Sequence, residues 1–340
     1  MSIKFEFLPN PGESILITID NQFTILMDGG NSHPFQRKFF ALGIPTPVVD
    51  MVIVTHIDKD HIGGIVQIFK DQNHLKNIKY LLFNEPEKCN LFFSPNDSRE
   101  VSRKDGDSLL KLLKENKHIE YIKCLHTLNE NLEHYLTEII PNTQVKILSP
   151  TLSTLRELQT EWTPQKWKQE TEICAKIEET SEKDINSLAQ QKYGLDDKLP
   201  NKSSIALILT HNYKNYLLLG DAHIDQINNA LKELGFNMDN PLDVEFVKLS
   251  HHGSIKNINE EFLKTIRTNK YIICNPSQTS TKHPNKQTIA QIAVFGNSLD
   301  QKQPKEIMLT KKSNINLHFS EQDHQDFNFS ISRNINKLEF

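Results

Sequence analysis

The residues with the greatest capacity for chemistry are four side chains in one short stretch, His56, Asp58, Asp60 and His61. They follow residues 48–55, an almost unbroken apolar run that predicts a strand buried on both faces. Neutral imidazoles and carboxylates are common ligands of Zn²⁺, Mn²⁺ and iron. A tight turn can bring four such side chains together, whereas an extended strand would send His56 and His61 to opposite faces. The spacing therefore predicts a metal-binding turn at a strand end.

Two other predicted strand ends carry residues of the same kind. Asp221 follows the apolar run 216–219 and a glycine, and the pair His251 and His252 follows the strand pattern 244–249. In α/β proteins, functional side chains gather at strand ends, where loops converge over a rigid sheet. A lone Gly-Asp or His-His pair is common at a polar surface. Three ligand-bearing strand ends in one chain nevertheless favour a metal centre.

The elements that would carry these strand ends are short β-prone runs separated by helical segments. Strand patterns occur at residues 4–8, 15–20, 23–27, 48–55, 78–83, 119–124, 145–148, 204–210, 216–219, 244–249 and 271–274. Helices are expected from after Gly64 through residue 70 and over residues 108–115, 222–234, 259–266 and 284–295. We expect Asp107 or Ser108 to cap the second of these helices, and Pro284 to lie in the first turn of the last. Three further strands are expected at sheet edges, at residues 306–309, 315–319 and 327–331.

Residues 153–200 differ from the rest of the chain. They are rich in helix formers and mixed charges, contain Trp162 and Trp167, and have few β-branched runs. This composition predicts two or three helices, the last opening at a capping box formed by Ser181 and Asp184. We interpret the segment as a helical insertion or lid within one domain that spans residues 1–340.

The charge balance limits the classes of partner. The chain of 340 residues has 39 Lys and Arg against 43 Asp and Glu, a net charge of −4. This argues against a dedicated DNA coat or a basic nucleic-acid clamp, though not against a nuclease that carries its own metal cations. The basic residues on and before one predicted helix are better explained as a solvated face; they are Arg103, Lys104, Lys111, Lys114 and Lys117.

The compartment can be predicted from what the sequence lacks. No apolar run approaches the ~18 residues of a membrane helix, and the N-terminal residues do not have the layout of a secretion signal. The four widely spaced cysteines form no C-x-x-C pair. We therefore expect a cytoplasmic protein with no membrane partner.

Taken together, the motifs resemble the metallo-β-lactamase superfamily. The resemblance rests on MDGG at residues 27–30, THIDKDHIGG at 55–64, LGDA at 219–222 and SHHGS at 250–254. The usual family block is HxHxDH, and Asp58 replaces its second histidine here. That variant, with SHHGS and NKSS at 201–204, is most similar to the hydrolase domain of ComEC-type DNA-uptake proteins and their free-standing soluble relatives. The resemblance implies an αββα sandwich of two mixed sheets flanked by helices.

The resemblance also implies a two-metal site between the sheets, holding two divalent ions, Zn or Mn. His56 and Asp58 would bind the first ion, and Asp60 and His61 the second. Asp221 would bridge both ions. Asp58 in place of histidine adds negative charge, which favours harder metals.

The rest of the implied site is less complete. His251 or His252 would complete the second metal site, and Asp28 would orient ligands through hydrogen bonds. The superfamily usually has a further histidine before the bridging aspartate. No histidine in that interval stands in a matching motif. His118, His126 and His134 lie there, and each is better explained as a surface residue. The first metal site is then weak, occupied by Mn²⁺ or completed by the substrate.

The chemistry expected of such a site is hydrolysis. Two divalent ions lower the pKa of a bridging water to about 7, and the resulting hydroxide is the nucleophile. Asp60, His252 and His283 are the candidates for catalytic roles, the two histidines by donating a proton or contacting phosphate.

The favoured substrate is a phosphodiester in nucleic acid or a nucleotide. One alternative is hydrolysis of a small ester, lactone or amide. Another is a metal-stabilised module with little turnover that binds a protein partner through residues 153–200.

Overall fold

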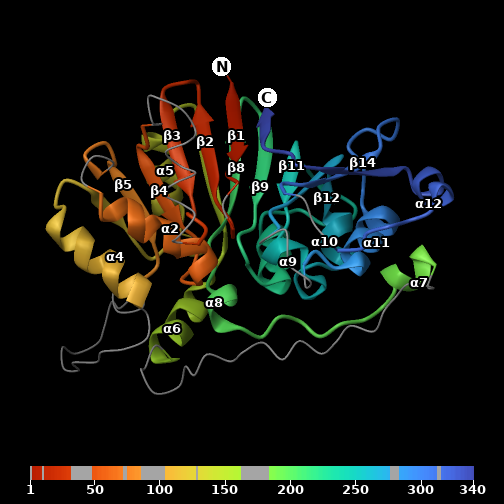
Figure 1. The fold of residues 1–340 in the computed structure, drawn as a ribbon, viewed down its shortest axis with the longest axis horizontal. Helices are drawn as coiled ribbons and strands as arrows, with labels where there is room; N and C mark the ends of the chain where they lie inside the picture. The colour runs from red at the N-terminus through yellow and green to blue at the C-terminus, as the bar shows by residue number, and fades with distance from the viewer. Residues whose placement is uncertain are drawn as a thin grey trace.

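The structure is a computed structural model that describes residues 2–9, 11–31, 48–71, 75–85, 104–127, 129–161, 184–275, 283–311 and 315–340. Its strands form two seven-stranded sheets and one two-stranded pair, with helices on the outside (Figure 1). Within the described residues, no helix is long and apolar enough to cross a membrane.

The first sheet has the strand order β16-β1-β2-β3-β4-β5-β6. Neighbouring strands are antiparallel from β16 to β3 and parallel from β3 to β6. The strands are β1 (Ile3–Phe7), β2 (Ile15–Ile19), β3 (Phe23–Met27), β4 (Met51–Val54), β5 (Tyr80–Phe83), β6 (Glu120–Ile122) and β16 (Lys337–Glu339).

The second sheet has the strand order β15-β14-β13-β11-β9-β8-β7. It is antiparallel from β7 to β9 and parallel from β9 to β15, so both sheets are mixed. The strands are β7 (Thr143–Ser149), β8 (Ala206–His211), β9 (Lys214–Leu218), β11 (Phe246–Lys248), β13 (Lys270–Ile273), β14 (Lys305–Leu309) and β15 (Phe329–Arg333). The separate pair is β10 (Leu242–Asp243) and β12 (Ile266–Arg267).

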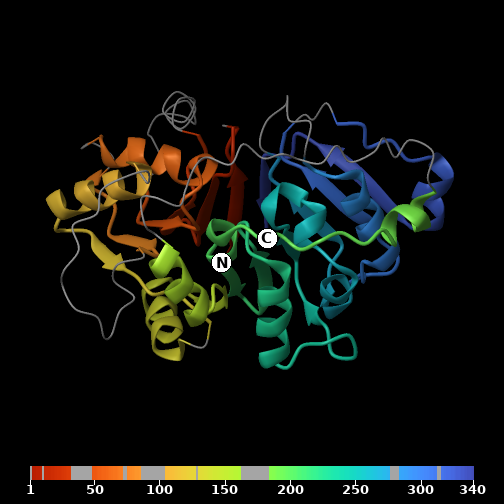
Figure 2. The same ribbon diagram turned by 90° about the horizontal axis from the view of Figure 1, so that it is seen from below.

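The helices of the described residues flank these sheets (Figure 2). They are α2 (Lys59–Phe69), α4 (Lys104–Glu115), α5 (Glu130–Ile139), α6 (Leu152–Glu161), α7 (Ile185–Ala189), α8 (Leu199–Lys202), α9 (Ile224–Glu233), α10 (Glu260–Thr265), α11 (Lys286–Phe295) and α12 (Glu321–Asp326). Two 3-10 turns, η3 (His251–Gly253) and η4 (Ile255–Asn257), follow β11.

The core explains why the sheets pack face to face. Phe5 of β1 contacts Tyr216 of β9 and Phe246 of β11, with ring centroids 5.1 and 4.7 Å apart. The outer face of the first sheet packs on α2 through residues such as Phe69, and the outer face of the second packs on helices such as α9 through residues such as Leu231. This gives the predicted αββα sandwich.

Most predicted strands form with small shifts of their ends, but the C-terminal segment differs. Residues 315–319 form no strand, because Leu317 and Phe319 are buried on the outer layer of the second sheet rather than paired with a neighbour. β14 lies inside the second sheet and not at its edge. The edge of the first sheet is completed by β16, a short charged strand that the apolar pattern did not predict.

Three predicted helix starts also differ. Within the described residues α4 begins at Lys104, so Asp107 and Ser108 lie inside it rather than at its cap. Pro284 precedes Asn285, the N-cap of α11, and is therefore outside that helix. In the segment 153–200, Asp184 caps α7 by accepting a hydrogen bond from the Ser187 amide. The partner expected for it, residue 181, and both tryptophans lie outside the described residues.

Candidate metal centre

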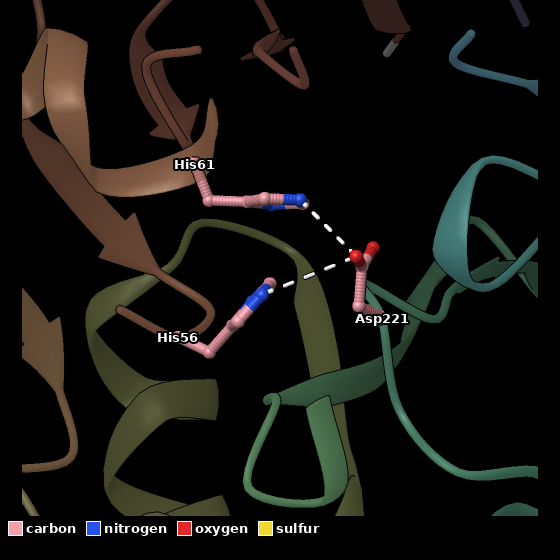
Figure 3. A group of neighbouring side chains, drawn as sticks. All are labelled: His56, His61 and Asp221. Atoms are coloured by element: carbon pink, nitrogen blue, oxygen red, sulfur yellow. Dashed lines mark ion pairs between the residues drawn. The ribbon is translucent and has the colours of Figure 1, made fainter. Parts of the chain in front are cut away.

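Three strand ends meet between the two sheets. β4 leads to His56, β9 leads to Asp221, and β11 leads to His251 and His252 in η3. Figure 3 shows His56 and His61 approaching Asp221 from the opposite side of the site. The structure thus brings together residues that lie up to 196 positions apart in the sequence.

The block after β4 is more helical than expected. α2 begins at Lys59, so Asp60 and His61 lie in its first turn, and Gly63 and Gly64 lie within the helix. The glycines fit there because the chain after β3 passes very close to α2. A Cβ added at Gly29 would lie 2.5 Å from the backbone of Ile65. Close packing of two backbones, rather than a turn, therefore accounts for this glycine-rich stretch.

Asp221 is the focus of the site. Among the described residues, four imidazole Nε2 atoms surround its Oδ2 atom, His61 at 3.4 Å and His56, His251 and His252 at 3.9 Å each. Distances near 3.9 Å are too long for hydrogen bonds. They leave room for an ion between ring and carboxylate, since both kinds of ligand bind Zn²⁺ at about 2 Å.

The opposite ring nitrogens of His61 and His252 are fixed by acceptors. His61 Nδ1 donates to Asp28 Oδ2 at 2.7 Å, and His252 Nδ1 donates to the carbonyl of Cys274 at 2.6 Å. A proton on Nδ1 leaves the lone pair of the neutral ring on Nε2. In their neutral form both rings would therefore present the Nε2 lone pair to a cation beside Asp221, as metal-binding histidines do.

The other two histidines are held in a related way. The Thr55 hydroxyl donates to Asp28 at 2.7 Å, so its oxygen can accept from His56 Nδ1, 3.1 Å away. His251 Nδ1 lies 3.0 Å from Asp196 Oδ2. Although burial lowers it, the carboxylates of Asp221 and Asp196 raise the pKa of His251 to about 9.

The remaining predicted ligands lie on either side of these rings. Asp60 Oδ2 is 3.1 Å from His252 Nε2, and Asp58 Oδ2 is 3.7 Å from His56 Nε2 with 41% of its side chain exposed. Two groups at the centre have ligand atoms within 4.8 Å of one another, the first formed by His56, His61 and Asp221 and the second by Asp60, His61 and His252; His61 also forms a third such group with Glu13 and Asp28. Both groups at the centre contain His61, and each offers three donors of the kinds that bind a divalent ion.

The polar atoms at the centre fit a cation. Within the part of the chain that the structure describes, His56 Nε2, His61 Nε2 and Asp221 Oδ1 are buried without a hydrogen-bond partner. Such atoms are costly unless something binds them. Although burial raises it, the surrounding histidines hold the pKa of Asp221 well below its usual range, and this keeps the carboxylate charged. Imidazole nitrogens around a charged carboxylate fit divalent Zn or Mn.

Comparison with known families bears on the same part of the chain. Residues 8–80 match the metallo-beta-lactamase superfamily. The matched stretch contains His56, Asp58, Asp60 and His61. The match supports the superfamily resemblance of the motifs at residues 27–30 and 55–64, and the motifs at 219–222 and 250–254 lie outside it. The two sheets with flanking helices have the αββα arrangement expected of the superfamily.

Individual relatives are similar over different extents. Anti-Pycsar protein Apyc1 of Bacillus phage 010DV004 is 36% identical over 55 residues, which cover 16% of this chain and 21% of the phage protein. The similar segment therefore spans about a fifth of that relative. Among solved structures, the metallo-beta-lactamase fold protein YhfI from Bacillus subtilis has a TM-score of 0.44 at 11% identity, covering 100% of this chain and 98% of YhfI. A diphosphatase of the PhnP family gives the same values.

The loop that carries the histidine pair has an unusual backbone. His251, His252 and Gly253 have φ angles of 46°, 55° and 77°, a left-handed conformation that costs energy for the two histidines. The loop is held by the His251 amide, which donates to the Gly220 carbonyl at 3.1 Å, and by the Thr288 hydroxyl, which donates to the Gly253 carbonyl at 2.8 Å. As a result both rings reach the centre, whereas the sequence left open which of the two would be a metal ligand.

The other predicted histidines do not lie at the centre. His283 is close to it, with its ring centroid 5.2 Å from that of His251, but belongs to neither ligand group. The histidines in the interval where the superfamily usually has a ligand make local contacts instead. His118 contacts the Leu75 carbonyl, His126 the Thr127 carbonyl and His134 the Glu138 carboxylate. His251 thus brings a fourth imidazole to Asp221, and none of these three does.

Several residues at the site were not predicted from the sequence. Asp196 accepts hydrogen bonds from His251 and Asn257, and Glu13 and Lys248 form a buried ion pair behind the centre. Lys248 had a visible signal, because it is a charge at the apolar end of the strand pattern that leads to the histidine pair. Glu13 and Asp196 lie in short polar segments that carry no such signal.

Proposed function

We propose that this chain is a metal-dependent hydrolase that uses two divalent ions, Zn or Mn, to cleave phosphodiester bonds. The observation that carries the proposal is the convergence of four imidazole Nε2 atoms on the buried carboxylate of Asp221, at 3.4 to 3.9 Å. A purely structural cluster of this kind would pair these nitrogens with donors or acceptors, whereas His56 Nε2 and His61 Nε2 are left for a cation.

In this proposal Asp221 would serve both metal sites. His56 and Asp58 would hold the first ion, and Asp60, His61 and His252 would hold the second. The hydrogen bond from His61 to Asp28 keeps the ligand lone pair on Nε2. When bound, the ions would acidify a water and neutralise the charge that develops on oxygen during hydrolysis.

His251 and His283 would have a different role. They lie side by side next to the centre and belong to neither ligand group. His251 is oriented by Asp196, and its Nε2 faces Asp221. We assign to this pair the contact with the substrate phosphate and the proton delivered to the leaving group.

The substrate class rests on the sequence. HIDKDH at residues 56–61, with SHHGS at 250–254, is most similar to the ComEC-like branch. We therefore place the chain in that branch and expect it to act on nucleic acid or a nucleotide.

In the same proposal, residues 153–200 form a lid within a single domain. Support comes from Asp196, which reaches His251, and from the extended segment between α7 and α8, which crosses the lower end of the molecule in Figure 1.

The test is turnover by the purified protein loaded with Mn²⁺ or Zn²⁺. Bis-p-nitrophenyl phosphate, cyclic nucleotides and single-stranded DNA are compared with p-nitrophenyl acetate and a lactone. We expect phosphodiester cleavage that chelation abolishes. Asp221→Asn should lower turnover by about 100-fold or more, because it removes the shared negative ligand. The exposed Asp225→Asn, four residues further on, should change nothing. Hydrolysis of esters without hydrolysis of phosphodiesters would contradict the proposal.

A further inference from the structure

Behind the candidate centre, a buried ion pair connects the two sheets. Glu13 lies between β1 and β2 of the first sheet, and Lys248 ends β11 of the second. Both side chains are 0% exposed and their charged ends are in contact. Burying two charges is costly, and a well-packed apolar pair is often at least as stable. A contribution to fold stability therefore does not by itself explain why these two charges are buried here.

Each member of the pair also bonds to the backbone that carries a candidate ligand. The Glu13 amide donates to the Asp60 carbonyl at 2.9 Å. Lys248 Nζ donates to the Gly220 carbonyl at 2.8 Å, directly before Asp221. One chain of contacts thus runs from Asp60, in the first turn of α2, to Asp221, which follows β9.

The Glu13 loop is fixed tightly against the same helix. Gly12 has a φ of +88°, and a Cβ added there would lie 2.1 Å from the Asp60 carbonyl oxygen. The next residue but one, Ser14, donates from its hydroxyl to the Asp28 carbonyl at 2.9 Å. A second lysine, Lys311, donates to the Gly12 carbonyl at 2.7 Å. The loop therefore cannot shift without moving Asp60 or Asp28.

The charges of the pair also lie close to the centre. Carboxylate oxygens of Glu13 and Asp28 and a ring nitrogen of His61 lie within 4.8 Å of one another. Although burial lowers it, the carboxylates of Glu13 and Asp221 raise the pKa of Lys248 above its usual value. The ammonium thus offsets part of the negative charge that the aspartates concentrate here.

We propose that Glu13 and Lys248 are a positioning pair that sets the separation of Asp60 and Asp221, and with it the affinity and spacing of the second metal ion. The pair touches neither the ions nor the substrate and acts through the two backbone carbonyls that it holds. This inference rests on the proposed two-metal function.

The test is the double variant Glu13→Gln and Lys248→Met, which removes both charges and leaves no unpaired ion. The full chain is titrated with Mn²⁺, and binding is followed by calorimetry and by the electron paramagnetic resonance signal of coupled Mn²⁺ pairs. We expect the second ion to bind at least about tenfold more weakly and the coupling to change. With metal saturating, kcat should fall while KM stays within about twofold.

A matched pair serves as control. Glu133 and Lys146 form an ion pair at 2.7 Å between α5 and β7, away from the centre. Glu133→Gln with Lys146→Met should leave both metal affinities and the coupling unchanged. If the double variant at the centre does not fold, Glu13→Gln alone, which keeps the shape of the side chain, should still weaken the second ion.

Two outcomes separate this inference from the function on which it rests. If the wild-type chain binds two ions and hydrolyses phosphodiesters, and the double variant matches its affinities and coupling, only the positioning role is wrong. If the wild-type chain binds no divalent ion, the proposed function fails and the positioning role fails with it.

Discussion

Asp28→Asn changes one atom at a residue that supports the centre without facing the cation position. Asp28 is fully buried and accepts hydrogen bonds from the Thr55 amide at 2.8 Å, the Thr55 hydroxyl at 2.7 Å and His61 Nδ1 at 2.7 Å. Its φ is 58°, a left-handed conformation that asparagine adopts more readily than most residues. The substitution should therefore leave the backbone in place and change mainly the hydrogen bonds.

The substitution should change the tautomer of His61. The carbonyl of the new amide can still accept from the Thr55 amide, but its NH₂ group now faces His61 Nδ1. Two donors cannot pair, so the ring proton moves to Nε2, which then offers no lone pair to a cation. Loss of such a supporting contact typically weakens metal binding by about 10–100-fold, which is about 1.4–2.7 kcal/mol. The stability of the metal-free chain should change by no more than about 1–2 kcal/mol.

The assay is competitive metal titration together with urea unfolding of the metal-free protein. Asp50→Asn is the matched control, because Asp50 is also buried and accepts from the Thr24 amide and Lys79, at the opposite end of β4. It should leave metal affinity unchanged. Wild-type metal affinity in Asp28→Asn would refute the argument that this carboxylate sets the tautomer of His61.

Two further substitutions test the packing and charge of the fold. Gly220→Ala should destabilise more than Gly235→Ala in urea unfolding. Both positions have positive φ, but only at Gly220 would an added Cβ clash, 2.4 Å from Ser204 Oγ. Equal losses of unfolding free energy in the two variants would contradict this. Lys305→Met should stabilise the fold by about 2 kcal/mol at pH 7. Burial lowers the pKa of Lys305 to about 8 from its usual 10.5, a cost of about 3 kcal/mol that the variant avoids, and the variant loses about 1 kcal/mol with the hydrogen bond from Lys305 to the Ala293 carbonyl. Because the folded wild type loses the Lys305 proton at a lower pH than the unfolded chain, its free energy of unfolding rises between about pH 8 and 10.5. The stability advantage of the variant should therefore shrink over that range. Urea unfolding at both pH values would check this.

The sequence predicts local structure well where one strand carries its own apolar pattern. β3 has the predicted ends, and β4 lies within the apolar run 48–55. The apolar pattern gives a wrong prediction where residues are buried by a helix layer and not by pairing within a sheet. Leu317 and Phe319 alternate like strand residues, but the ring of Phe319 packs beneath Lys286 at the start of α11 and no strand pairs with the segment. A short charged strand such as β16 gives no pattern of its own, because pairing with β1 creates it.

The candidate site was likewise predictable where its residues are close in the sequence and not where they meet across the fold. His56, Asp60 and His61 are close in the sequence and could be recognised as a block. The contacts of Asp196 and Glu13 depend on residues 55 and 235 positions away, His251 and Lys248, and no local spacing encodes them. They become visible only when the two sheets are assembled.

The most direct test of the two-metal centre is anomalous X-ray scattering from crystals of the protein grown with Mn²⁺ or Zn²⁺. We expect two anomalous peaks on opposite sides of the Asp221 carboxylate, one beside His56 and the other beside Asp60 and His252. A single peak, or peaks that do not contact Asp221, would contradict it.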